Sequence, residues 1–157
     1  MPARRNSSNF IFTFLGMLTA FGPFVTDMYL PGLPIMTKEF ATSVSMVQMG
    51  LTFSMLGLAF GQLVFGPLSD KIGRRRPLIF SMWLFIFSTT ACIFAPNIQI
   101  FVLLRFLQGI AASGGIVIAR SIATDKFKSR NLAKALAIVG AINGIAPIAA
   151  PVVGGSV

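Results

Sequence analysis

The chain has 157 residues, of which 55% are hydrophobic and only 11% charged, and thirteen basic against four acidic residues give it a formal charge of +9. A soluble domain carries about 25% charged residues, so this chain has too few polar side chains to cover a water-facing surface, and its composition indicates a protein dissolved in lipid. The absence of His excludes His-dependent triads and His metal sites, and a lone cysteine, Cys92, excludes intramolecular disulfides and multi-cysteine metal clusters.

Five stretches are long and apolar enough to cross a bilayer, which takes ~20 residues per helix. After a leader of residues 1–9 they cover residues 10–33, 44–68, 77–95, 98–124 and 132–157. The first stretch is too long for a signal peptide and lacks a clean cleavage site, so we expect it to be retained. Helix-end signals are Ser43 or Ser45 before the second span, Pro77 in the first turn of the third, and Asn97 as N-cap of the fourth. The sequence predicts an all-α membrane protein with five transmembrane helices.

Basic residues gather on one side of the predicted membrane. The leader and the connections after the second and fourth spans hold most of them: Arg4, Arg5, Lys71, Arg74, Arg75, Arg76, Lys126, Lys128, Arg130 and Lys134. The positive-inside rule then predicts that the N-terminus and both basic connections are cytoplasmic. Because these residues flank lipid-buried helices, they do not indicate nucleic-acid binding.

Small residues predict which helices pack closely, because they let helix backbones approach each other in lipid. The second span carries Gly50, Ser54, Gly57 and Gly61 at three- and four-residue spacing, and the fourth carries Ala111, Gly115 and Ala119. The first and fifth spans carry similar stripes, whereas the third is bulky nearly all round. We therefore expect the third span at the lipid edge and the other four in the interior.

Two ionisable residues lie well inside predicted spans, where a charge costs roughly 2.5–3.5 kcal/mol. At 1.5 Å per residue, Asp27 and Arg105 each lie about 10 Å from the outer end of their helix. Pairing would lower the cost of burying both, and Gln108 on the same helical face as Arg105 could bridge them. The pair is interpreted either as a static packing contact or as a switch that opens when Asp27 takes up a proton.

Four motifs resemble those of the major facilitator superfamily. Residues 66–76, with Gly66, Asp70, Gly73, Arg74 and Arg75, resemble its loop signature G-x-L-x-D-x-x-G-R-[KR]. In the drug:proton antiporter branch, the string from Asp27 to Pro34 is similar to the end of the first helix, and the string from Arg105 to Gly109 is similar to the fourth-helix motif. Residues 147–155 resemble the fifth-helix antiporter motif, with Ala150 where glycine is usual before proline.

The motifs look most like the bicyclomycin/chloramphenicol-resistance (Bcr/CflA) subfamily, which implies a bacterial inner-membrane efflux protein that exchanges protons for drugs. The resemblance implies proton coupling by Asp27, Arg105 and Gln108, and a cytoplasmic gate built from the loop-signature residues. It also implies a flexible fifth-helix segment at Pro147, Pro151, Gly154 and Gly155. Such transporters have twelve helices in two halves. We therefore expect an incomplete N-terminal half, without the sixth helix and the C-terminal half, that does not transport alone.

The expected partners are the bilayer, protons, a small hydrophobic drug-like substrate and the C-terminal half of the transporter. A proton gradient supplies the energy in this hypothesis, with no cofactor and no metal, and only Tyr29 is assigned to substrate binding. Alternatives are an uptake carrier for a metabolite, within the same superfamily, or a membrane scaffold that does not transport. No nucleophile–base set and no phosphate-binding glycine loop is present, so an enzyme is not expected.

Overall fold

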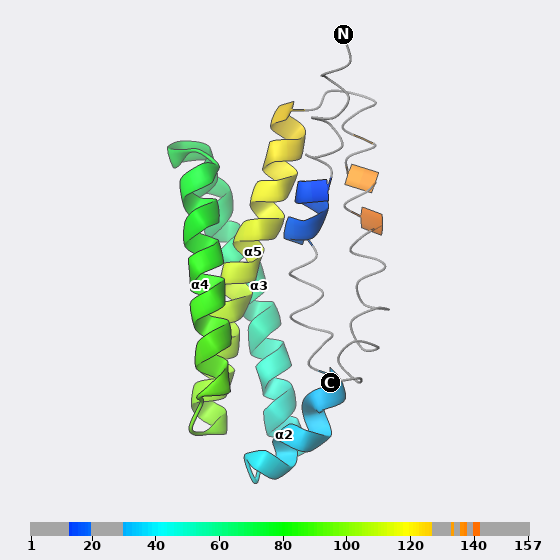
Figure 1. The fold of residues 1–157 in the computed structure, drawn as a ribbon, viewed down its shortest axis with the longest axis vertical. Coiled ribbons are helices and arrows are strands. Elements are labelled where there is room, and N and C mark those ends of the chain that lie inside the picture. The colour runs from blue at the N-terminus through cyan, green and yellow to red at the C-terminus, as the bar shows by residue number, and fades with distance from the viewer. Residues whose placement is uncertain (1–12, 20–29, 127–132, 134–135, 138–139, 142–157) are drawn as a thin grey trace.

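The computed structural model describes residues 13–19, 30–126, 133, 136–137 and 140–141. Every regular element in these ranges is helical, as the sequence predicts. Residues 13–19 form a helical segment, and the labelled elements are the 3-10 helix η1 (Leu30–Gly32) and the α-helices α2 (Leu33–Glu39), α3 (Val44–Ile72), α4 (Arg75–Ile93) and α5 (Ile98–Lys126). Figure 1 shows α3, α4 and α5 as long rods, with α4 at one edge and the short α2 at the lower end.

Three of the described helices are long and apolar enough to cross a membrane. They are α3 with 29 residues, α4 with 19 and α5 with 29, and their apolar stretches have mean hydropathies of 1.5, 1.4 and 1.8. These helices correspond to the second, third and fourth predicted spans. Most of the first predicted span and nearly all of the fifth lie outside the described residues, so those two spans stay predictions.

Helices α3 and α5 begin where the capping residues predict, but they do not end where the apolar stretches end. The Ser43 hydroxyl accepts a hydrogen bond from the Met46 N–H at 3.3 Å, and the Asn97 side-chain oxygen accepts one from the Ile100 N–H at 2.9 Å. The helices nevertheless extend past the predicted cytoplasmic ends, by four residues in α3 and two in α5. A helix satisfies its own backbone hydrogen bonds, so it continues into polar sequence after it leaves the apolar layer.

The predicted first span ends at residue 33, and no helix is predicted between it and the second span. The structure instead has η1 at Leu30–Gly32 and the separate helix α2 at Leu33–Glu39. Pro34 stands at the start of α2, where its fixed φ suits a helix and its missing N–H costs nothing. This helix has only seven residues and includes the polar residues Thr37, Lys38 and Glu39. A search for long apolar stretches therefore does not detect it.

Helix α5 lies at the centre of the described bundle. In its most apolar stretch 56% of the residues are buried, against 22% in α3 and 17% in α4. One side of α5 contacts the small-residue stripe of α3, whose predicted members Gly50, Ser54, Gly57 and Gly61 are all buried. Towards the C-terminal end of α5, Ala119 and Ala123 pack against Leu15 and Leu18 of the segment 13–19.

The third predicted span, α4, exposes its bulky side chains as expected, including Trp83 and Phe87. Its contact with α5 uses the few small residues on the opposite face. Ser81 is fully buried, and a Cβ added to Gly114 of α5 would overlap it. The third span therefore lies at the edge of the described bundle as expected, and one of its few small residues, Ser81, makes the close contact with α5.

Candidate functional site

A charged cluster forms where α3 ends and α4 begins. Gly73 ends α3 with a φ of +85°, a conformation that L side chains rarely adopt, and so reverses the chain within two residues. The turn returns Arg74 towards the last turn of α3, where Asp70 and Ser69 lie.

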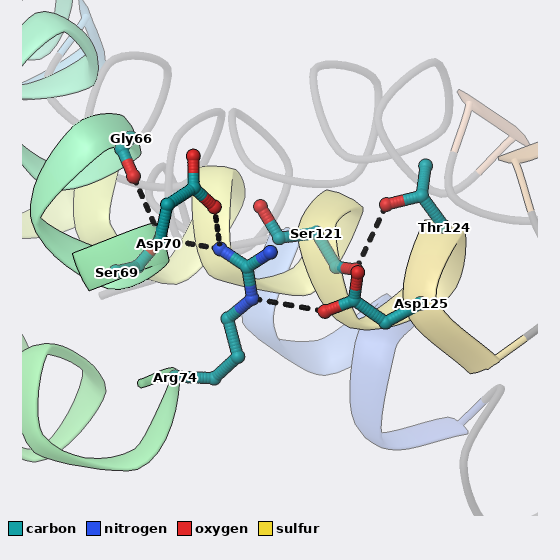
Figure 2. A network of polar contacts seen from close by, with 7 residues as sticks. All are labelled: Gly66, Ser69, Asp70, Arg74, Ser121, Thr124 and Asp125. Atoms are coloured by element: carbon teal, nitrogen blue, oxygen red, sulfur yellow. Dashed lines mark hydrogen bonds and ion pairs between the residues drawn. The ribbon is translucent and has the colours of Figure 1, made fainter. Parts of the chain in front are cut away.

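Arg74 is the centre of this cluster, and Figure 2 shows its guanidinium between acceptors on two helices. It forms an ion pair with Asp70, donates to the Ser69 hydroxyl at 2.7 Å, and donates from Nε to Asp125 Oδ2 of α5 at 3.0 Å. The Ser69 hydroxyl in turn donates to the carbonyl of Gly66 at 2.9 Å. Asp70 lies in the last turn of α3, which continues to Ile72, and it faces the start of α4 through its ion pair with Arg74.

The structure thus brings together four of the five predicted gate residues, Gly66, Asp70, Gly73 and Arg74. Arg75 is the first residue of α4 and its side chain is exposed. Asp125 was missed by the sequence reasoning, which treated the connection after the fourth span only as basic. A signal was present, because the chain has only four acids and Asp125 stands beside that basic run.

The electrostatics of the cluster are those of a partly exposed site. The hydrogen bond to Asp125 is the main cause that raises the pKa of Arg74; desolvation opposes it, and Asp70 adds to the rise. The side chains of Asp70 and Asp125 are 67% and 54% exposed, whereas that of Arg74 is 26% exposed. Ion pairs this exposed are typically worth about 1 kcal/mol or less. The cluster therefore joins the ends of α3 and α5 without locking them.

Replacing Asp125 with asparagine should lower the free energy of unfolding by about 0.5–1 kcal/mol, because Arg74 loses a charged partner that links it to α5. Thermal unfolding in detergent at low salt measures the loss. The difference from wild type should shrink at high salt, where exposed charges are screened. Glu39→Gln, at the exposed Glu39 of α2, is the control. Equal losses in the two variants, or a loss independent of salt, would contradict the proposed link.

A second polar group lies inside the apolar part of α5. Arg105 and Gln108 are each only 6% exposed. Arg105 Nη1 donates to Gln108 Oε1 at 2.6 Å, as their shared helical face predicts, and Gln108 Nε2 donates to Thr89 Oγ1 of α4 at 2.8 Å. The guanidinium carbon also lies 5.9 Å from the ring centroid of Phe101. Thr89 could not be identified from the sequence, since a hydroxyl in an apolar span does not by itself indicate whether it binds a polar partner or only packs.

This polar chain lies about 10 Å along α5 from its start at Ile98, at 1.5 Å per residue. A guanidinium at such a depth is stabilised only by polar partners, and Gln108 is one of them. Such buried charges usually mark ion or substrate pathways in membrane proteins.

The remaining predicted site residues lie outside the described residues. They are Asp27, Tyr29, Pro147, Pro151, Gly154 and Gly155. The pairing of Asp27 with Arg105, the substrate contact of Tyr29 and the flexible fifth-helix segment stay predictions.

Long apolar helices, a buried guanidinium within one of them and a charged turn at the end of two others are together typical of a multi-pass membrane transporter. Residues 12–157 match the family model of the Major Facilitator Superfamily. The chain therefore belongs to this superfamily of membrane transporters.

Three relatives illustrate the similarity. The chain is 45% identical over 143 residues to the "uncharacterized MFS-type transporter YdgK" of Bacillus subtilis, covering 91% of this chain and 36% of the relative. It is 34% identical over 154 residues to a "bicyclomycin resistance protein homolog" of Haemophilus influenzae, covering 96% and 38%. It is 34% identical over 128 residues to the "multidrug resistance protein MdtL" of Salmonella paratyphi C, covering 82% and 32%. The matched part of the chain thus covers between 32% and 38% of the length of these three relatives.

Proposed function

We propose that the chain forms part of a proton-coupled multidrug efflux transporter of the bacterial inner membrane, which exchanges drugs for protons by alternating access. The observation that carries the proposal is the buried Arg105, held by Gln108 inside a helix that can span a membrane. Membership of the superfamily supports a transport role, and the names of two relatives point to bicyclomycin and multidrug resistance. The N-terminus is proposed to be cytoplasmic, on the charge distribution alone.

In the proposed mechanism Asp27 is the acid that takes up the exchanged proton. As a carboxylate it would pair with Arg105, which lowers the cost of holding both charges in lipid. Proton uptake would cancel the charge of Asp27 and release the guanidinium, so that only one protonation state favours the paired arrangement. A drug that binds the other arrangement would then be exchanged against the proton.

The charged cluster around Arg74 is proposed to act at the cytoplasmic side. Because Arg74 contacts Asp70 on α3 and Asp125 on α5, it holds these two helix ends together. Helices joined in this way would move as one body when the transporter changes its access.

Replacing Asp27 with asparagine in the whole protein tests the proposal. We expect export driven by a pH gradient to be lost, while drug binding is retained in part, because the amide keeps the shape of the side chain but cannot exchange a proton. Export into proton-loaded inverted vesicles and equilibrium drug binding measure the two effects, with Glu39→Gln as the matched acid-to-amide control. Undiminished pH-driven export in the Asp27 variant would remove Asp27 from the mechanism.

Growth under drug challenge separates efflux from uptake. Cells that produce the whole protein should tolerate a hydrophobic drug better than cells that produce the Asp27→Asn variant. If growth under drug is the same in both while accumulation of a metabolite rises with the protein, the chain belongs to an uptake carrier instead.

A further inference from the structure

The contact between α4 and α5 contains one polar link at the depth of Arg105. Thr89 Oγ1 accepts a hydrogen bond from Gln108 Nε2 at 2.8 Å across nineteen residues of sequence. Gln108 Oε1 accepts from Arg105 Nη1 at 2.6 Å. The three side chains therefore form one chain that starts on the edge helix and ends at the buried guanidinium.

The direction of these hydrogen bonds follows from the chemistry of the groups. A guanidinium has only donors, so Arg105 can contact the amide of Gln108 only through its oxygen. The amide nitrogen is then turned towards α4, where it needs an acceptor, and the hydroxyl of Thr89 is that acceptor. Arg105 thus fixes which end of the amide faces the guanidinium, and Thr89 holds the other end against α4, so that the Gln108 side chain is held between the two helices.

We propose that Thr89 is a positioning residue for proton coupling: by orienting Gln108, it holds Arg105 in the geometry that a carboxylate partner must meet. This inference rests on the proposed function, since it assigns Thr89 to the same coupling site. In this proposal α4 does not only face lipid. Through Thr89 and Gln108 it also helps to fix the side-chain conformation of Arg105. Because the Arg105 side chain is already held in place, less conformational entropy is lost when a carboxylate pairs with it.

Three variants at two neighbouring positions test the role. Thr89→Val keeps the shape and removes the acceptor, and Thr89→Ser keeps the acceptor. Thr90→Val is the matched control, because the exposed Thr90 hydroxyl donates to the carbonyl of Ile86 in its own helix and, among the described residues, to no other helix. Each variant is made in the whole protein, in inverted vesicles, and two rates are compared: pH-gradient-driven drug export, and drug–drug exchange without a gradient.

A side-chain hydrogen bond is typically worth about 1 kcal/mol, or about fivefold in an equilibrium. We expect Thr89→Val to slow gradient-driven export about three- to tenfold while drug–drug exchange stays near wild type. Thr89→Ser should restore export, and Thr90→Val should leave both rates unchanged. A loss of both rates in Thr89→Val, or no rescue by serine, would indicate a packing role and overturn the proposal, as would equal export in Thr89→Val and Thr90→Val.

The outcome also separates this inference from the proposed function. If wild type shows no gradient-driven export, or Asp27→Asn exports normally, the function itself fails. If wild type exports, Asp27→Asn does not, and Thr89→Val behaves as Thr90→Val does, only the role of Thr89 fails.

Discussion

Replacing Gly57 with alanine is expected to lower the free energy of unfolding by about 1–3 kcal/mol, a typical cost of overpacking a tight contact. A Cβ at this position would collide with the backbone carbonyl of Phe106 on α5 and lie 3.1 Å from the amide nitrogen of Ile110. Since the obstacle is backbone, no side chain can move away, and α3 and α5 must separate. Thermal unfolding of the protein in detergent measures the loss.

Gly66→Ala is the matched control on the same helix. Its added Cβ would have no neighbour closer than Val117 Cγ1, at 4.0 Å. Alanine favours helix over glycine by about 1 kcal/mol, so this variant should be neutral or slightly more stable. Gly109→Ala tests the contact from the α5 side, because its Cβ would meet the backbone of Ser54 and Leu58. A Gly57 variant as stable as the Gly66 variant would show that the two helices are not in backbone contact.

Replacing Arg105 with glutamine is expected to slow gradient-driven export in the whole protein by roughly 10- to 100-fold. A hydrogen bond to a charged group is worth about 1.5–3 kcal/mol, and the variant also removes the charge that would pair with Asp27. Arg105→Lys should retain a small part of the activity, because an ammonium keeps the charge but not the planar fork that reaches two partners at once. Export into proton-loaded inverted vesicles measures both variants.

Arg120→Gln is the control for the Arg105 variants. Arg120 is on the same helix but is exposed near its C-terminal end, so the loss of its charge should change export little. Unfolding temperature and drug binding, measured beside export, separate a coupling defect from a folding defect. If Arg105→Gln exports as the Arg120 variant does, the guanidinium in α5 is not part of proton coupling.

Features that depend on a few neighbouring residues were predictable from the sequence. Ser43 and Asn97 cap their helices as expected, because a cap needs only a side-chain acceptor and the next turn. Gly73 reverses the chain because few other residues adopt its φ without strain. The contact of Gln108 with Arg105 follows from their spacing of three on one helix. Helix α2 was the exception, since hydropathy does not detect a short helix with polar residues.

By itself, the sequence determined that the protein is helical and membrane-embedded, which helix faces carry small residues, and which side chains place charge in lipid. These properties follow from the amino-acid composition and from the helical repeat of about 3.6 residues, which decides which side chains share a face of one helix. Only the tertiary structure decided that Asp125 meets Arg74 and that Thr89 meets Gln108, because each pair joins different helices. The relative rotation and height of two helices come from how closely their backbones approach, as at Gly57 and Gly109. No local pattern contains that information.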